Sequence, residues 1–552
     1  MADETNRRSF LKGTGAALAG LALPTATVSA RSAEKRYVVD LEDASADALD
    51  GLTVVHDLRQ IDIAVVEGDP DSVSGLRHSK DVEMQFQVDR EYGDEDHEDD
   101  DDRDDDEGES DHFDGRDYWD DESELPSRFA LQWDKQCQEL LEVAEETRGE
   151  GTRVSVIDSG AIADHPDLEG PLNADLSRNF TGDGGDFTPY SNDHGTHVAG
   201  VIAADGSSDA GVLGTAPATD LVALRVFTGP FAFFGDIIAA MVYSAEIGSD
   251  VANMSLGVYP LPKDADTATL RDAIERAASD ANEKGTLMVA AAGNDGVNLD
   301  ADGDVISLPN EADNVLSVSA TGPIGYRWDD ENEEEEERAP EEGSGSEETA
   351  GSEAGGEWGR RDDDGELEDY DDPLDDLREP TTAPATYTNY GREAVDISAP
   401  GGNYVADPPS DANWQYDMVL STVFEWGDND DTMVPAYGWK AGTSMAAPQV
   451  SAAAALVKSL NPRATPGDVR RHLLDTAAEL DQPTYSGGGH LDLQEAVEED
   501  VERRDEDRDD ADEAEDGERD ENGEDGDETG REERGDDETG SRADAETTER
   551  GG

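Results

Sequence analysis

Three short segments of the sequence each combine a reactive polar side chain with a glycine turn. Asp158 ends the apolar run "VSVIDSG", His194 stands in "NDHGTHVAG", and Ser444 stands in "GTSMAAP". A serine hydroxyl is a weak nucleophile unless an imidazole removes its proton, and a buried carboxylate fixes the tautomer of that imidazole. These three residue types together suit attack on a carbonyl carbon, provided that the fold brings them to one place.

A fourth segment, and the helix expected at Ser444, offer donors for the negative charge that such an attack creates. The N-terminal end of a helix presents free backbone N–H groups and the positive end of the helix dipole. Asn294 ends the strand-like run "AAAGNDG", and its side-chain amide could donate a second hydrogen bond to the oxyanion. Gly195 and Gly442, which lie near His194 and Ser444, would let a substrate approach the backbone closely.

The elements that must position these residues follow one another in a regular alternation after Arg153. Continuous β-branched runs predict buried strands, and amphipathic runs between them predict helices. Such an alternation predicts an α/β fold with a mainly parallel sheet covered on both faces, whose strand ends gather active-site residues along one edge. The strand-like runs are "RVSVID", "LVALRV", "DVANMSLG", "TLMVAAAGN" and "VLSVSA", and the helical ones include "GDIIAAMVYSAEIG" and "ATLRDAIERAASDANEKG".

Each candidate residue also has a purely structural interpretation. Asp158 could cap a strand end, His194 could be a surface imidazole, Asn294 could be a turn residue and Ser444 could cap its helix. Taken jointly, these interpretations require four coincidences beside glycine turns at sheet-edge positions, so we favour the catalytic one. His197, in the same turn as His194, is expected to pack rather than to react.

The four segments resemble those of the subtilisin-like serine proteases, in that family's order of Asp, His and Ser. The resemblance runs from about Leu131 to Val497, and the acidic composition is similar to that of the secreted haloarchaeal halolysin-like members. It implies a three-layer αβα sandwich preceded by a small α+β prosegment, and a serine endopeptidase that acts through an acyl-enzyme without a catalytic cofactor. Ser444 would be the nucleophile, His194 the general base and then acid, and Asp158 the orienting carboxylate, with Asn294 as oxyanion donor.

The same resemblance suggests which residues contact the substrate. "NMSLG", from Asn253 to Gly257, is similar to the family strand that lines the substrate cleft. We expect uncharged S1 walls and therefore a preference for apolar or aromatic P1 residues. The expected wall residues are Ser255, Leu256, Gly257, Ala292 and Gly293.

The family pattern is less complete at the calcium site and on the nucleophile helix. Asp167 matches a family calcium ligand and Gln132 matches a second, which makes a structural Ca²⁺ ion conceivable. In the loop that would supply the other ligands, Ser208 stands where asparagine is expected. Gln449 stands where the family often has histidine, and we expect altered packing there rather than inactivity.

The composition is strongly acidic. The chain has 137 Asp and Glu against 41 Lys and Arg, a formal net charge of −96. Nucleic acid and anionic membrane surfaces are therefore excluded as partners, because binding to phosphate needs clustered basic residues. At molar salt, charges are screened over about 3 Å, whereas in dilute buffer self-repulsion would weaken the fold. The charge therefore predicts a salt-dependent protein.

The N-terminal residues predict export. Arg7 and Arg8 are followed by an apolar run from Ala16 to Leu23 and by small residues up to Ala30. This is typical of a twin-arginine signal peptide, and the run is too short to span a membrane.

The single cysteine, Cys137, excludes an intramolecular disulfide and is expected to be packed.

Composition changes along the chain predict its domain boundaries. We expect a signal peptide at 1–30, a prosegment at 31–93, an acidic linker at 94–124, a peptidase domain at 125–498 and an acidic tail at 499–552. An acidic insertion at about 328–379 interrupts the peptidase domain and could fold back over the cleft. The family resemblance implies that the prosegment acts as chaperone and inhibitor and that the mature protein starts between Gly93 and Ser127.

The expected partners are protein and peptide substrates and the chain's own prosegment, with no stable membrane association, and we expect a monomer. Two rival functions remain open. One is a catalytically silent subtilase-like protein used for binding or surface display. The other is a secreted esterase or amidase with the same triad, which is disfavoured because the sequence lacks a G-x-S-x-G elbow.

Overall fold

The computed structural model of the chain describes residues 31–45, 48–85, 90–93, 125–208, 210–325, 381–405, 414–427, 432–499 and 501. The predicted signal peptide, acidic linker and acidic insertion lie outside the described residues, as does nearly all of the predicted tail. Among the described residues, no helix is both long enough and apolar enough to cross a membrane.

A seven-stranded sheet forms the centre of the predicted peptidase domain. All of its neighbouring strands pair in parallel. The α/β fold with a mainly parallel sheet, predicted from the alternation of strand-like and helical runs, is confirmed. In sheet order the strands are β16 (Ile397–Pro400), β15 (Val315–Thr321), β13 (Leu287–Ala291), β11 (Val251–Met254), β6 (Arg153–Asp158), β8 (Asp220–Arg225) and β7 (Arg178–Asn179).

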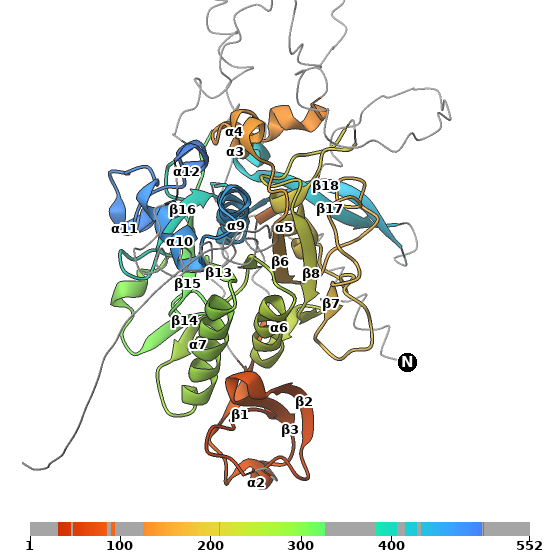
Figure 1. Cartoon of the computed structure of the whole chain (residues 1–552), viewed down its shortest axis with the longest axis vertical. Coiled ribbons are helices and arrows are strands. Elements are labelled where there is room, and N and C mark those ends of the chain that lie inside the picture. Colours follow the sequence, from red (N-terminus) through yellow and green to blue (C-terminus); the bar gives the residue numbers. More distant parts are fainter. Residues whose placement is uncertain are drawn as a thin grey trace, which may run out of the picture. The chain divides into compact units, whose positions relative to one another are not determined.

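Helices cover both faces of this sheet. Alternate strand residues point to opposite sides, so the strands present an apolar surface on each face, and each surface needs a helix layer to bury it. Leu221 and Ala223 of β8 join the apolar core beneath α5 and α9. Val222 and Leu224 join the core beneath α6 and α7, and Figure 1 shows these two helix pairs on either side of the strands. The helices are α5 (His194–Ala203), α6 (Phe234–Glu246), α7 (Ala268–Glu283) and α9 (Thr443–Leu460).

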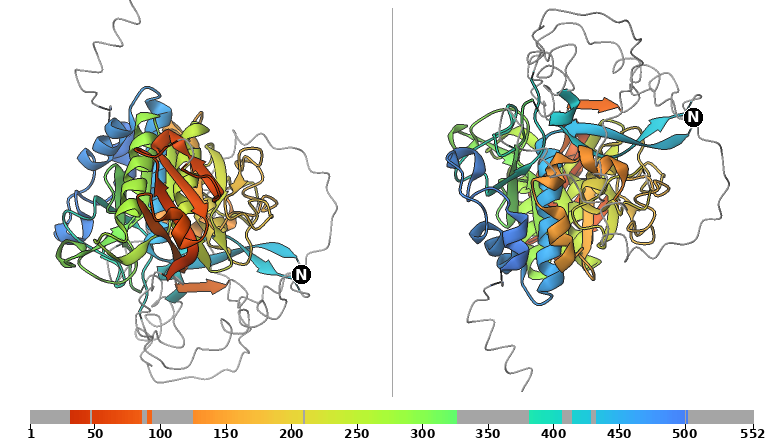
Figure 2. Two further views of the ribbon diagram at one scale, coloured as in Figure 1. Left: turned by 90° about the horizontal axis from the view of Figure 1, so that it is seen from below. Right: turned by 90° about the horizontal axis from the view of Figure 1, so that it is seen from above.

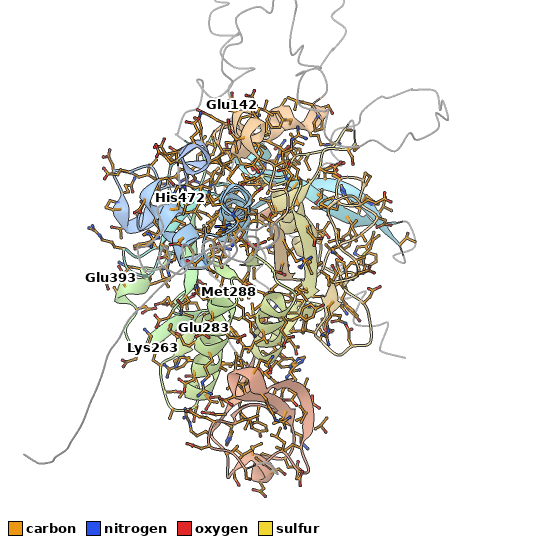
Figure 3. The ribbon with its side chains drawn as sticks, viewed as in Figure 1. Glu142, Lys263, Glu283, Met288, Glu393 and His472 are labelled. Atoms are coloured by element: carbon orange, nitrogen blue, oxygen red, sulfur yellow. The ribbon has the colours of Figure 1, made fainter. Side chains whose placement is uncertain are left out.

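Shorter elements surround this frame. In Figure 3, Met288 lies among the core side chains, whereas Glu142 and Glu393 lie at the margin. Thr465 caps α10 through a reciprocal capping box with Asp468. These elements are α3 (Trp133–Gln136), α4 (Leu140–Glu146), α10 (Pro466–Asp475), α11 (Pro483–Ser486), α12 (Leu493–Glu498), β9 (Phe227–Thr228), β10 (Phe231–Phe233), β12 (Val258–Pro262), β14 (Val305–Leu308), β17 (Val419–Trp426) and β18 (Met433–Ala441).

The N-terminal module has a small core of its own but shares its sheet with the peptidase domain. Its strands join β10 and β9 in one sheet of order β2-β3-β1-β4-β10-β9, in which Met84 of β4 lies opposite Ala232 of β10. The module consists of β1 (Arg31–Asp40), β2 (Thr53–Leu58), β3 (Ile63–Glu67), α2 (Pro70–Val73) and β4 (His78–Gln85), and β5 (Arg90–Gly93) then pairs with β18.

The module also supplies acceptors for the first turns of two peptidase helices. The Asp81 carboxylate accepts a hydrogen bond from the Gly235 N–H of α6 at 3.0 Å. The Ser79 hydroxyl accepts from Thr269 N and Leu270 N of α7 at 3.1 and 3.3 Å. The first N–H groups of a helix have no partner within the helix, so the module completes both helix starts. Figure 2 shows its strands side by side with these helices.

Candidate active site

The sheet edge formed by strand carboxyl ends carries all four predicted catalytic residues. Asp158 is the last residue of β6 and His194 is the first residue of α5. Asn294 follows β13, and Ser444 lies in the first turn of α9. Asp158, His194 and Ser444 expose 0%, 1% and 7% of their surfaces, so the polar groups act in a largely dry environment.

The carboxylate of Asp158 orients the ring of His194. His194 Nδ1 lies 2.9 Å from Asp158 Oδ1 and 3.0 Å from Oδ2. Asp158 Oδ1 also accepts the Ser159 N–H at 2.6 Å, which fixes the carboxylate in place. An ionised carboxylate can only accept hydrogen bonds, so it holds a proton on Nδ1 and leaves Nε2 as the basic nitrogen of the neutral ring.

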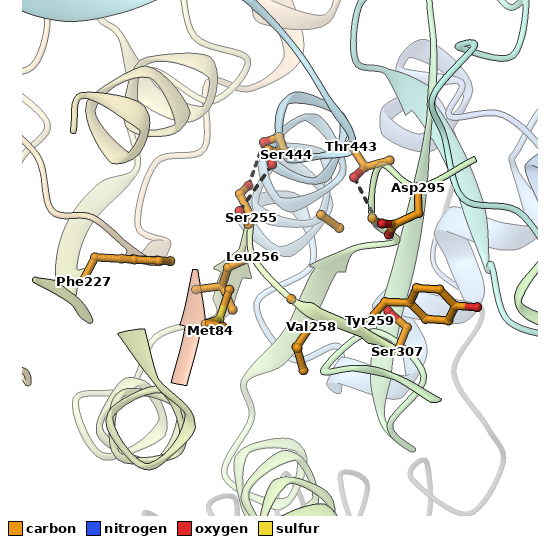
Figure 4. A pocket seen from close by; sticks show the side chains of 13 residues that line it. Met84, Phe227, Ser255, Leu256, Val258, Tyr259, Asp295, Ser307, Thr443 and Ser444 are labelled. Atoms are coloured by element: carbon orange, nitrogen blue, oxygen red, sulfur yellow. Dashed lines mark hydrogen bonds between the residues drawn. The ribbon is translucent and has the colours of Figure 1, made fainter. Parts of the chain in front are cut away.

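The backbone of Ser444 is tied to the segment that follows β11. The Ser255 hydroxyl donates to the Ser444 carbonyl at 2.7 Å, and the Ser444 hydroxyl donates to the Ser255 carbonyl at 3.3 Å. Figure 4 shows both contacts at the start of α9. A hydroxyl hydrogen can rotate to another acceptor, so the serine side chain is placed at the helix start without being locked there.

The side-chain amide of Asn294 is oriented by the same helix start. Its Oδ1 accepts hydrogen bonds from the Thr443 backbone N–H and from the Thr443 hydroxyl, both at 2.9 Å. Thr443 Oγ1 in turn accepts the Gly293 N–H at 3.1 Å. Because the amide is planar and its oxygen faces Thr443, its NH₂ group points away from Thr443.

Replacing Asn294 by alanine is expected to lower kcat by about 10²–10³-fold with a small change in KM, because the donor acts on charge that develops in the transition state. Steady-state kinetics on a peptide substrate measure both constants. Asn310→Ala is the matched control, since it removes a buried asparagine amide that contacts Ser317 and not the start of α9. A similar loss in both variants would contradict the assigned role.

A cavity beside Ser444 contains most of the predicted S1 residues. Ser255, Leu256, Gly257 and Gly293 line it, together with Ala291. Ala292, which the sequence analysis expected in the wall, is not among the lining residues, and its carbonyl accepts a hydrogen bond from Asn389. The side chains of successive residues near a strand end point to opposite sides. Ala291 rather than Ala292 therefore faces the cavity.

Several other lining residues were not expected from the sequence, and three of them change the chemistry of the cavity. Phe227 and Met84 add apolar surface, and Figure 4 shows Met84 of the N-terminal module beside Leu256. Asp295 contributes a carboxylate whose Oδ2 accepts a hydrogen bond from Asn389 at 3.3 Å. The lining is therefore not free of charge. Asp295 could have been suspected from its place next to Asn294, whereas Met84 gives no sequence signal.

Most of the chain is similar to known proteins. The model of the subtilase family matches residues 149–495. The chain belongs to the subtilase family. A twin-arginine translocation signal matches residues 4–24, so this subtilase is exported. As the sequence predicts, it is a serine endopeptidase. Members of this family need no catalytic cofactor.

Several relatives of this subtilase are known. Subtilisin BL of Lederbergia lenta is 30% identical over 350 residues, which cover 63% of this chain and 91% of that protein. A halolysin-like extracellular serine protease of Natrialba magadii is 29% identical over 358 residues, covering 64% of this chain and 48% of that protein. The crystal structure of the epidermin leader peptide processing serine protease of Staphylococcus aureus shares the fold with a TM-score of 0.58 at 20% identity, covering 86% of this chain and 100% of that one.

The two predicted calcium ligands, Asp167 and Gln132, lie against the same loop, but hydrogen-bond donors engage their oxygens. Asp167 accepts the N–H groups of Ser208 and Val212 at 3.1 and 3.0 Å and the Tyr437 hydroxyl at 2.9 Å. Gln132 Oε1 accepts the N–H group of Leu213 at 2.8 Å.

No group of three or more His, Cys, Asp or Glu side chains in the described part of the chain could hold a metal ion. Burial and the nearby Asp167 raise the pKa of Tyr437, which therefore stays a donor to the carboxylate. These residues do not fit a calcium site in this arrangement, because backbone and hydroxyl donors take the positions that a cation would need.

Two other expectations concern packed residues. His197 Nε2 lies 3.0 Å from the Val419 carbonyl and 3.1 Å from that of Gly438. Burial lowers the pKa of His197 well below its usual value, so it is a neutral packed side chain, as expected. Burial likewise raises the pKa of the Cys137 thiol, which keeps that thiol protonated and unreactive.

Proposed function

We propose that this subtilase hydrolyses peptide bonds through Ser444, His194 and Asp158, with Asn294 and the Ser444 N–H as oxyanion donors. The Asp158–His194 pair beside the start of α9 is the observation that carries the proposal. The test is a comparison of casein hydrolysis at molar salt by the wild type and a Ser444→Ala variant.

The steps follow from the roles of the three side chains. His194 Nε2 takes the proton of Ser444 Oγ as that oxygen bonds to the substrate carbonyl carbon, and the carbonyl oxygen becomes an oxyanion. The tetrahedral intermediate then collapses, the C–N bond breaks, and His194 gives its proton to the leaving amine. A water molecule, deprotonated by His194, attacks the acyl-enzyme in the same way and releases the acid and Ser444.

Within the predicted prosegment (31–93), the module up to Gln85 acts in this proposal as the inhibitor that the enzyme removes itself. Three observations support this role: β4 continues the β10–β9 sheet, Met84 lines the candidate cleft, and Asp81 and Ser79 complete the starts of α6 and α7. Because Gln85 pairs with β10 and Arg90 pairs with Ala441 near Ser444, the cleavage falls between Gln85 and Arg90. This lies upstream of the range expected from the sequence.

Charged contacts also hold the prosegment on the peptidase domain. Arg36 and His56 of the module both pair with Asp236 of α6, His56 Nε2 at 2.7 Å. Within the module, Arg36 also pairs with Asp81 at 2.7 Å. Arg36, Asp81 and Asp236 are all buried, so these pairs are shielded from salt. The prosegment can therefore stay bound at the salt concentrations at which the protein works.

The S1 cavity is expected to prefer apolar or aromatic P1 residues, to tolerate basic ones through Asp295, and to exclude acidic ones. The apolar lining gains free energy from a buried side chain, whereas its one carboxylate repels another. A P1 library measures the profile, and Asp295→Ala should selectively reduce cleavage after Lys and Arg. A wild-type profile dominated by Lys or Arg would contradict the apolar preference.

We expect activity and stability to depend on salt. At low ionic strength the net charge of −96 is unscreened, so the melting temperature in dilute buffer should lie about 10 °C or more below its value in molar NaCl. Calorimetry at several NaCl concentrations measures the change, and sucrose at equal osmolarity is the control because it does not screen charge. Full activity and an unchanged melting temperature in dilute buffer would exclude salt dependence.

A further inference from the structure

A buried ion pair lies behind the active site in the four-residue helix α3. Asp134 and Lys135 are 0% and 1% exposed, and Lys135 Nζ lies 3.4 Å from Asp134 Oδ2. The neighbouring Trp133 anchors this helix, since its indole N–H donates to the Met418 carbonyl at 3.0 Å. Removing two charges from water costs several kcal/mol per ion unless further hydrogen bonds satisfy both groups.

Gln449 donates to one member of the pair and accepts from the other. Its Oε1 accepts from Lys135 Nζ and from the Thr215 hydroxyl, both at 2.8 Å, and its Nε2 donates to Asp134 Oδ2 at 2.7 Å. An amide oxygen has two lone pairs and can serve both of these close donors, with Gln138 Nε2 as a third donor at a longer 3.4 Å, whereas a ring nitrogen of a neutral histidine has only one lone pair. This accounts for glutamine at a position where the family often has histidine.

The same ammonium group reaches the helix that carries His194. Lys135 Nζ donates to the Val201 carbonyl of α5 at 3.1 Å and contacts the Thr215 hydroxyl at 2.8 Å. Val201 lies about two turns after His194 in α5, and Gln449 lies less than two turns after Ser444 in α9. Lys135 therefore joins the histidine helix to the serine helix at a point behind both reacting side chains, where the two helices pack together.

We propose that Lys135, Asp134 and Gln449 form a positioning unit that sets the separation of α5 and α9, and so aligns His194 Nε2 with Ser444 Oγ. The inference rests on the proposed triad. Misplacement of a reacting group by about 1 Å can cost on the order of 10²-fold in rate, and a buried hydrogen-bonded network resists such a shift more than an apolar contact does. None of the three residues touches the substrate, so their effect passes through the two helices.

The test exchanges the charge between two network positions. Gln449→Met removes both amide contacts, and Gln449→Glu places a second carboxylate beside Asp134. Both variants should lower kcat by about 10-fold or more while KM stays within about 2-fold. Asp134→Asn combined with Gln449→Glu exchanges the amide and the carboxylate between the two positions and keeps the lysine. This double variant should bring kcat back to within about 3-fold of the wild type.

All rates are expressed per active site titrated with a peptide phosphonate, so that unfolded molecules are not counted. Lys458→Met is the matched control, because Lys458 lies on α9 but donates to the Ala464 carbonyl at 2.7 Å and not to α5. Its kcat should not change. Where Gln449→Glu gives no titratable sites, Gln449→Met carries the same test.

The positioning role is overturned if kcat per titrated site is unchanged in the Gln449 variants, even when their melting temperature falls. It is also overturned if the double variant folds but does not recover kcat. Failure of the triad itself is distinguishable, because Ser444→Ala would then still hydrolyse peptides, whereas the Gln449 variants leave the nucleophile and its titration intact.

Discussion

Ser444→Ala is expected to lower kcat for casein and peptide substrates by about 10⁶-fold, to a level set by the remaining oxyanion donors and binding contacts. Alanine removes the only atom that can bond to the acyl carbon, while the start of α9 keeps its contacts with Asn294 and Ser255. Steady-state assays at molar salt measure the loss of kcat. The folded protein should have a melting temperature close to that of the wild type, since only a hydroxyl is lost.

The same variant tests self-processing. The protein should accumulate at its unprocessed length on gels, whereas N-terminal sequencing of the mature wild type should find a start between Gln85 and Arg90. Ser451→Ala is the matched control on the same helix, since the Ser451 hydroxyl contacts Asn253 at 2.9 Å and not the cleft; it should remain active and be processed. Unchanged hydrolysis and prosegment removal in Ser444→Ala would exclude the mechanism.

Asp158→Asn is expected to lower kcat by about 10⁴-fold. The side chain keeps its shape, but its amide can donate to His194 Nδ1, which favours the tautomer that carries the proton on Nε2. That tautomer cannot take the proton of Ser444. The loss should appear in kcat more than in KM, because the imidazolium that Asp158 stabilises forms only as the reaction proceeds.

Kinetics over a range of pH, together with active-site titration, measure this effect. Asp167→Asn is a suitable control, because Asp167 is also a fully buried carboxylate that accepts backbone N–H groups but does not contact His194. It should lower the melting temperature and leave kcat per titrated site nearly unchanged. Equal losses of kcat in the two variants would mean that Asp158 acts through stability alone.

The sequence by itself determined the architecture and the reactive groups. Continuous apolar runs such as that ending at Asp158 can only be buried on both faces, which requires a parallel sheet between helix layers. The four candidate catalytic residues were found because each combines a reactive side chain with a glycine turn at a strand or helix end. Both signals are local, so they can be read from short stretches of sequence.

Only the tertiary structure decided which distant residues meet. The Lys135–Gln449 contact joins positions separated by 314 residues, and the placement of Met84 in the candidate cleft depends on pairing between β4 and β10. The lining of the cavity beside Ser444 by Ala291 rather than Ala292, and the donors around Asp167, depend on side-chain direction and loop packing. Such contacts are set by the three-dimensional fit of many elements, and no local period or spacing in the chain encodes them.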